Sequence, residues 1–293
     1  MATWNSPAVA RRWLAHELRT RREALGLSQS AVGRACGWSG VKVSYIENAQ
    51  QKSITDEELD KLLPLYEVDE AAQGDFYAAA AAAREKGWWE RKYDDDVVAP
   101  YLADFIGLEQ GASLIRTFEP TIIPGLLQTR DYMKAVAVGD MVRRTERRVR
   151  QIVDVREARR AVLTRDDQPA EFVALVDESV LHRVVGGPAL MAAQLDFVVA
   201  LMERPNISFH VFPFERGVRQ GLTSASHRIL HFARTEPPVV FVETQDDAQW
   251  IEDPAAVDLH DLAFEELLRS ALTKDESREM VTAMRERYAA RAS

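Results

Sequence analysis

Residues 37–48, G-W-S-G-V-K-V-S-Y-I-E-N, predict a short helix that begins directly after a glycine turn. Ser39 belongs to the residue types that cap helix N-termini, so the new helix is expected to begin there. An earlier helix is expected to begin after Ser28, which is placed to cap it, and to end at Cys36. Gly37 interrupts the helical pattern at that point. Two short helices joined by a turn of about three residues are typical of the helix-turn-helix motif.

Three further helices are expected around this pair. Residues 9–25 carry apolar side chains at helical spacing with arginines between them. Thr55 and Glu58 form a capping box that opens a helix ending near Pro64. The alanine-rich residues 69–86 favour a helix by propensity. The N-terminal part is therefore predicted to be an all-α bundle of five helices.

Composition places the chain among folded soluble proteins. Hydrophobic residues make up 46% of the 293 residues and charged residues 28%, which excludes a mostly disordered chain. No window approaches the roughly 18 apolar residues of a membrane span, and no apolar leader is seen, so we expect a cytoplasmic protein without membrane contact. The single cysteine, Cys36, is expected to be buried rather than reactive.

The formal charge is unevenly distributed along the chain. The whole chain carries −9, whereas residues 1–52 hold eight basic and three acidic side chains, an excess of +5 that leaves −14 for the remainder. Attraction to phosphate depends on the local patch, because salt screens charges beyond roughly 10 Å. An acidic protein with a basic N-terminal bundle is therefore expected to be able to bind DNA through that bundle.

Helical periodicity assigns one face of the helix after Gly37 to the outside. With Val43 and Ile46 facing the core, the opposite face should meet DNA, because such a helix lies in the major groove. The candidate DNA-binding residues are Gln29, Ser39, Gly40, Val41, Lys42, Ser44, Tyr45 and Asn48.

These residues suit different contacts. Val41 can touch a thymine methyl group, and Ser44 or Tyr45 can hydrogen-bond a base or a phosphate. Lys42 is better placed to neutralise a phosphate, and Gln29 to bond the DNA backbone. Replacing Lys42 should therefore weaken binding to all sequences alike, whereas changing Ser44 or Tyr45 should alter the preference among sites.

The spacing S-Q-x-x-V-G-x-x-x-G-W-S-x-x-K-V-S-x-I-E-N over residues 28–48 resembles the lambda-repressor-like helix-turn-helix of the xenobiotic-response-element family, over roughly residues 11–70. The resemblance implies DNA binding; the alternative is a helical interaction domain with an inert solvated face. Gly40 and Val41 stand where many members carry polar base readers, so DNA shape is expected to contribute. Ala49 replaces a glycine that is common after the helix.

The domain junction is expected in the polar stretch G-W-W-E-R-K-Y-D-D-D at residues 87–96. We predict a DNA-binding domain at 1–86, a linker at 87–99 and a larger domain at 100–293. The D-D-D run is interpreted as a solvated part of the linker rather than as a metal site.

The larger domain is predicted to be α+β, with a small, mainly antiparallel sheet and C-terminal helices. Short β-rich runs predict strands at 171–176, 207–212, 227–232 and 239–242. Helices are expected at 126–138, 141–164, 188–203 and 256–272, and a final helix after a Thr273/Glu276 capping box.

Three segments of the larger domain carry a second resemblance. They are T-F-E-P-T-I-I-P-G-L-L-Q-T-R-D-Y at 117–132, V-V-G-G-P at 184–188 and V-F-P-F-E-R-G at 211–217. They resemble a domain of unknown function that follows such helix-turn-helix modules in actinobacterial regulators, over most of residues 100–285. The likeness implies an antitoxin-like regulator with a small companion protein. Candidate ligand or partner contacts are Gln128, Thr129, Tyr132, Phe212 and Phe214, with structural turns and strand ends as the alternative.

No catalytic constellation is recognised. None of the six histidines lies in a metalloprotease helix or a nucleophile triad context. His227 and His231 on a strand would lie about 13 Å apart, too far to share a metal. We expect no catalytic residue, no metal and no cofactor, and hence no enzyme.

The sequence therefore predicts a sequence-specific transcriptional regulator that binds a double-stranded operator as a homodimer. Two copies should place their reading helices roughly 34 Å apart, with dimer contacts from the larger domain or its final helices. The larger domain would sense a small molecule or a small partner protein. The alternative is an antitoxin that sequesters a companion encoded nearby and autoregulates its own operon.

Overall fold

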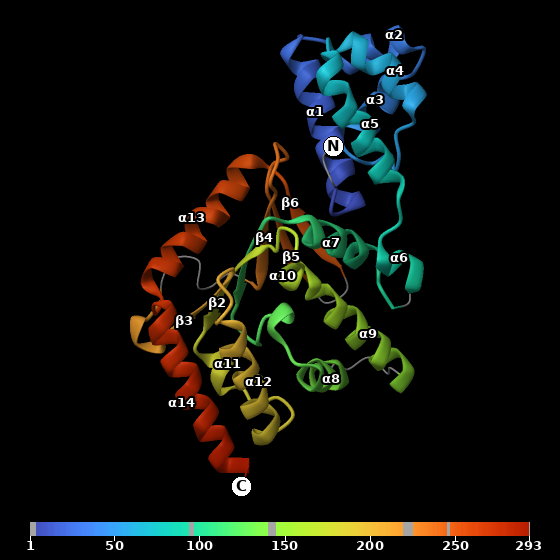
Figure 1. Cartoon of the computed structure of the whole chain (residues 1–293). Coiled ribbons are helices and arrows are strands. Elements are labelled where there is room, and N and C mark those ends of the chain that lie inside the picture. The colour runs from blue at the N-terminus through green and yellow to red at the C-terminus, as the bar shows by residue number, and fades with distance from the viewer. Residues whose placement is uncertain (1–3, 94–96, 140–144, 219–224, 245–246, 293) are drawn as a thin grey trace. The chain divides into compact units, whose positions relative to one another are not determined.

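The computed structural model describes residues 4–93, 97–139, 145–218, 225–244 and 247–292 (Figure 1). The chain forms two compact units, one made of residues 1–92, 103–111 and 232–236, and the other made of the rest. This division differs from the predicted boundaries, because two segments of the predicted larger domain belong to the first unit. Part of the predicted linker is helical, as α6 (Trp88–Lys92), and buries Trp89. The D-D-D run lies outside the described residues.

The first unit contains the five predicted helices in order. They are α1 (Pro7–Ala24), α2 (Gln29–Cys36), α3 (Gly40–Glu47), α4 (Asp56–Leu65) and α5 (Glu70–Arg84). Ser28 and Ser39 cap α2 and α3, and Thr55 forms the predicted capping box with Glu58. The expected all-α bundle is confirmed.

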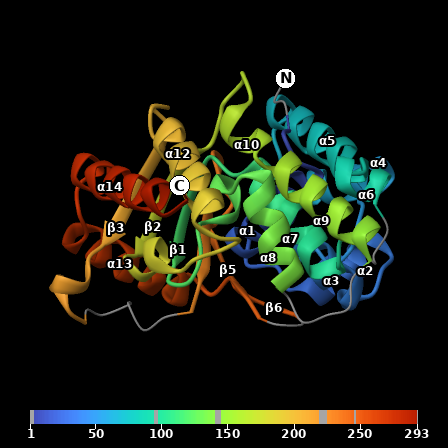
Figure 2. The same cartoon turned by 90° about the horizontal axis from the view of Figure 1, so that it is seen from below.

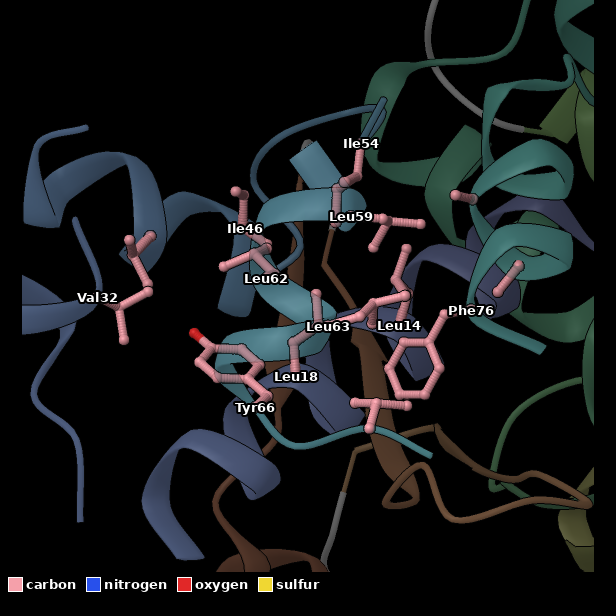
Figure 3. Packing of buried hydrophobic residues seen from close by; sticks show 14 of the residues in the cluster. Leu14, Leu18, Val32, Ile46, Ile54, Leu59, Leu62, Leu63, Tyr66 and Phe76 are labelled. Carbon is pink, nitrogen blue, oxygen red and sulfur yellow. The ribbon is translucent and has the colours of Figure 1, made fainter. Parts of the chain in front are cut away.

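The bundle encloses its own apolar core. Leu14 of α1, Leu63 of α4 and Phe76 of α5 converge in it (Figure 3), and each is at most 1% exposed. Cys36 is buried in the same core, which confirms its predicted position. Trp38 packs against the edge of this core at the turn between α2 and α3.

Two later segments of the chain complete the first unit. One is α7 (Pro100–Gly111) from residue 103 onward, where the carbonyl of Gly107 accepts a 2.5 Å hydrogen bond from Ser6 Oγ. The other is residues 232–236, in which the Arg234 guanidinium carbon lies 4.5 Å from the centre of the Trp4 ring. The N-terminal bundle is thus not built from N-terminal sequence alone.

The second unit is an α+β domain around one sheet. Its strands are β1 (Leu114–Glu119), β2 (Glu171–Asp177), β3 (Ile207–Phe212), β4 (His227–His231), β5 (Val239–Glu243) and β6 (Ala248–Ile251). Its helices are α8 (Arg130–Gly139), α9 (Glu146–Arg159), α10 (Ala161–Thr164), α11 (Ser179–His182), α12 (Pro188–Leu201), α13 (Pro254–Ser270) and α14 (Lys274–Ala292). Short 3-10 helices lie at Gly125–Leu127, before α8, and at Phe214–Arg216, after β3.

The α+β class is confirmed, but the prediction of a small, mainly antiparallel sheet is wrong. The sheet has six strands in the order β3-β2-β1-β4-β5-β6. The pairs β1–β2 and β2–β3 are parallel and the other pairs are antiparallel. Helical segments connect β1 to β2 and β2 to β3, and such crossovers allow neighbouring strands to run parallel.

Helices cover the sheet on both faces (Figure 2). Helix α13 buries Val257, Phe264 and Leu267 against one face. Helix α12 lies on the other, and α14 packs along α12 with its buried apolar side chains. The predicted Thr273/Glu276 capping box opens α14, since the Glu276 carboxylate accepts from Thr273 N at 2.8 Å. Within the described ranges, no helix is both long and apolar enough to cross a membrane.

Candidate nucleic-acid interface

Two glycines let α2 and α3 approach each other closely. A Cβ atom at Gly33 would lie 2.9 Å from Gly40 N, and one at Gly40 would lie 3.0 Å from Ser30 Oγ. Gly37 adopts the left-handed conformation, with φ 75°, and Trp38 N–H donates to Gly33 O at 2.7 Å. Gly40, predicted as a DNA contact, thus lies in a tight contact between the two helices.

The outward face of α3 carries the predicted side chains. Val43 and Ile46 are buried, as expected, while Val41 is 60% exposed and Tyr45 53% exposed. Ser44 is half-buried beside them. Large apolar side chains this exposed on one helix face are suited to contact another surface.

Polar side chains hold both ends of α3. Ser39 Oγ accepts a hydrogen bond from Lys42 N at 3.2 Å. Asn48 Nδ2 donates to Ser44 O at 2.9 Å and to Ser44 Oγ at 3.1 Å. These contacts fix the helix ends, and a DNA contact by Ser39 or Asn48 stays a prediction.

Lys42 is paired within the protein. Its Nζ lies 2.5 Å from Glu58 Oε1 and 4.3 Å from the centre of the Trp38 ring. Burial raises the pKa of the Glu58 carboxyl, but hydrogen bonds from Lys42, Thr55 and Gln51 outweigh it and the pKa is lowered. The sequence showed Glu58 only as a capping residue; its pairing with Lys42 depends on how α4 packs beside α3.

A buried ion network fixes the back of α3. Glu47, 4% exposed, accepts from Arg22 Nε at 2.7 Å, from Gln29 Nε2 at 2.9 Å and from Tyr66 OH at 3.3 Å. The hydrogen bond with Glu47 raises the pKa of Arg22, and burial followed by the Glu47 charge raises the pKa of Tyr66. Gln29, predicted to bond the DNA backbone, here ties α2 to α3.

The first unit is not basic as a whole, contrary to expectation. Residues 53–92 carry ten acidic and five basic side chains, which cancels the excess of +5 in residues 1–52. Several arginines and lysines of residues 1–52 are paired inside the unit, as in Arg19–Glu23 and Lys42–Glu58. Attraction of this unit to a polyanion would therefore depend on local cations such as the exposed Arg34 of α2.

Ala49, just after the C-cap of α3, adopts a strained conformation with φ 56°. A residue with a Cβ atom is disfavoured there, at a cost of roughly 1–2 kcal/mol. We expect Ala49→Gly to raise the free energy of unfolding by about 1 kcal/mol. The greater conformational entropy that glycine gives the unfolded chain offsets part of this gain. Urea unfolding would measure it, with Ala78→Gly, near the middle of α5, as a control that should destabilise. A loss of stability in Ala49→Gly would contradict the strain.

Three of the five candidate ligand residues lie inside the second unit. Gln128, Tyr132 and Phe212 are each at most 1% exposed. Gln128 Nε2 donates to Ile123 O at 2.7 Å, and Tyr132 OH accepts from Ile123 N at 3.3 Å. The burial of these three side chains supports the alternative of structural turns and a strand end, and a ligand or partner contact by them stays a prediction.

Thr129 and Phe214 have different surroundings. Thr129 caps the start of α8, since its Oγ1 accepts from Tyr132 N at 3.3 Å. Phe214 is 55% exposed, its N–H donates to Glu178 Oε2 at 2.8 Å, and its ring stacks on His182. Among the five candidates, Phe214 alone combines an exposed ring with fixed placement.

Two of the segments that carry the second resemblance, 117–132 and 211–217, leave the sheet at the carboxyl ends of its parallel strands. β1, β2 and β3 run parallel, so the residues after Glu119, Asp177 and Phe212 leave the same edge. Ser179 Oγ donates to Pro120 O at 3.0 Å, which joins the residues that follow β2 to those that follow β1. Ligands of α/β sheets commonly bind outside the carboxyl ends of the strands.

Two known families match parts of the chain. A helix-turn-helix domain matches residues 13–73, which contain α2, α3 and their turn, so the first unit carries a DNA-binding helix-turn-helix. The Domain of unknown function (DUF5753) matches residues 102–283, and the chain belongs to this family. Neither the curated proteins nor the solved structures gave a match to the chain.

Proposed function

We propose that the protein is a sequence-specific transcriptional regulator that binds duplex DNA through the outward face of α3. The observation that carries the proposal is the exposure of Val41 and Tyr45 on a helix that is capped at both ends. The buried Arg22–Glu47 pair holds the opposite side of this helix. A rigid helix with large side chains presented outward is suited to the major groove.

The composition of this face determines how sequence is read. Val41 near the N-terminus of α3 offers methyl groups to thymine, and Tyr45 one turn later offers a hydroxyl group to a base or a phosphate. Few polar base readers are present, so the deformability of the operator is proposed to contribute to specificity. Specific affinity should exceed affinity for random DNA by at least about a thousandfold.

The test uses the full chain and footprinting on the promoter upstream of its own gene. Protection of a near-palindromic site, resistant to excess random duplex, is the expected result. Binding should weaken steeply with salt. Equal binding to the promoter fragment and to random duplex at every salt concentration would contradict the proposal.

Lys42 is expected to contact phosphate more strongly once Glu58 no longer holds it. Glu58→Gln keeps a capping acceptor but removes the charge that pairs with Lys42. We expect DNA affinity to rise by about twofold to fivefold, and Lys42→Ala to cost more in this background than in the natural chain. Fluorescence anisotropy with one operator duplex and one random duplex measures both.

Glu57→Gln is the matched control, because it removes a neighbouring exposed charge of the same helix turn. It should raise affinity less than Glu58→Gln does. If the two variants bind alike, or if Lys42→Ala weakens binding to the operator alone, the assignment of Lys42 to phosphate is wrong.

We propose that the second unit receives the regulatory signal, from a small molecule or a small partner protein, at the edge where β1, β2 and β3 end. The exposed and immobilised Phe214 favours a partner protein, since aromatic anchors of this kind dominate protein interfaces. An antitoxin-like role, in which the chain sequesters a companion encoded nearby, is the alternative use of the same edge. Phe214→Ala should reduce binding of that companion, whereas Val138→Ala, an equally exposed side chain on α8, should not.

A further inference from the structure

Two helices in the described part of the chain present a pair of large exposed apolar side chains on one face. One is α3, with Val41 and Tyr45. The other is α13, where Leu259 is 57% exposed and Leu262 61% exposed, one helical turn apart. The remaining large exposed apolar side chains do not form such pairs; they are Leu25, Val138, Val184, Phe214 and Val218.

The exposed leucines are not left over from the packing of α13 on the sheet. That packing uses Val257, Phe264 and Leu267 on the opposite side of the helix. The neighbouring α14 buries its own apolar side chains, including Val281 and Tyr288. Among the two C-terminal helices, α13 is therefore the one with apolar surface to offer.

We propose that α13 is the homodimer surface and that it pairs antiparallel with α13 of a second copy about a two-fold axis. The inference rests on the proposed function in one respect, because a helix-turn-helix that reads a near-palindromic site is used as a two-fold pair. The occupant of this face is thus a second copy of this chain.

The outward stripe of α13 has the spacing of a helix-pairing seam. Positions 255, 259, 262, 266 and 269 recur at intervals of three and four residues. They carry alanine, two leucines, glutamate and arginine. The apolar residues lie toward the N-terminal half of the helix, and the one basic residue lies near the C-terminal end.

Charge selects the register of the pair. When the two-fold axis passes between Leu259 and Leu262, each Leu259 faces the partner's Leu262. In the same register Arg269 faces the partner's Glu252, which lies just before the helix. With the axis at Leu262 instead, Asp258 would face the partner's Glu266, which like-charge repulsion disfavours. Arg269 already lies 2.6 Å from Glu266, so the favoured register joins three charged groups at each end.

The size of this surface sets the expected strength. Stable interfaces bury about 1,200 Å² or more, and four leucines cover only a fraction of that. We therefore expect a weak dimer in solution, which the two half-sites of an operator would strengthen by holding both copies close together.

Sedimentation of the full chain over a range of concentrations tests the surface. Leu262→Asp should raise the dimer dissociation constant at least tenfold, while Val138→Asp, a comparably exposed position on α8, should leave it unchanged. Both positions are exposed, so circular dichroism should show both variants folded. Equal dissociation constants for Leu262→Asp and the natural chain would overturn the proposal.

A charge exchange tests the register. Arg269→Glu should weaken the dimer, and Arg269→Glu combined with Glu252→Arg should restore it. If the combination fails to restore the dimer, antiparallel pairing in this register is wrong. A duplex with one half-site separates the two proposals: Leu262→Asp should bind it like the natural chain, whereas failure of the natural chain to bind any duplex would sink the proposed function alone.

Discussion

Arg22→Met is expected to destabilise the first unit by about 3–5 kcal/mol. The Glu47 carboxylate would remain buried without its cationic partner, and an uncompensated buried charge costs about that much. Urea unfolding followed by tryptophan fluorescence measures the effect. The signal reports mainly the first unit, because it contains Trp4, Trp13, Trp38, Trp88 and Trp89, leaving Trp250 in the second.

Arg19→Met is the matched control for Arg22→Met. Arg19 lies on the same helix and also pairs with a glutamate, Glu23, at 2.9 Å, but both side chains are about half exposed. Exposed pairs contribute about 0–1 kcal/mol, so this variant should unfold almost as the natural chain does. Replacing Arg22 and Glu47 together by methionine should recover much of the loss, and similar losses in both single variants would contradict the role of the buried network.

Tyr45→Ala is expected to reduce operator affinity by about 1–3 kcal/mol, roughly fivefold to 150-fold, with little change in stability. The side chain is more than half exposed, so its loss removes a contact with DNA rather than core packing. Val41→Ala should cost less, since it removes only two methyl groups. Anisotropy titrations of each variant with the operator and with a random duplex measure how much affinity is lost for each DNA.

For Tyr45→Ala, the loss should be larger on the operator than on the random duplex. Val138→Ala, which shortens an exposed side chain on α8, should bind both duplexes unchanged. An operator affinity that survives Tyr45→Ala would mean that α3 does not read DNA through this face.

Local features of the first unit could be predicted from the sequence, because neighbouring residues determine them. Ser28, Ser39 and Thr55 each cap a helix through the residue three positions further on. The outward placement of Val41 and Tyr45 follows from helical periodicity. The buried network could not be predicted, because Arg22, Glu47 and Tyr66 meet only after the bundle closes.

The sheet also depends on contacts between residues far apart in the sequence, so it could be predicted only in part. The sequence does not predict β1, because Arg116 and Thr117 interrupt its apolar pattern. Arg116 is compensated by Asp261 at 2.8 Å, a partner supplied by α13 far along the chain. Parallel pairing likewise depends on crossovers that periodicity does not reveal. Segments without regular secondary structure have no hydrophobic periodicity that distinguishes buried from exposed side chains. The sequence therefore could not show that Gln128 is buried and Phe214 exposed.

The reading of DNA by α3 is tested most directly by selecting preferred duplexes from a random library with the full natural chain and with the Val41→Ala/Tyr45→Ala variant. The natural chain should enrich one near-palindromic sequence with half-sites one helical turn apart. The variant should lose or change the preferred bases while still binding weakly to the DNA backbone. Enrichment of the same bases by both proteins, or no enrichment by the natural chain, would contradict the account.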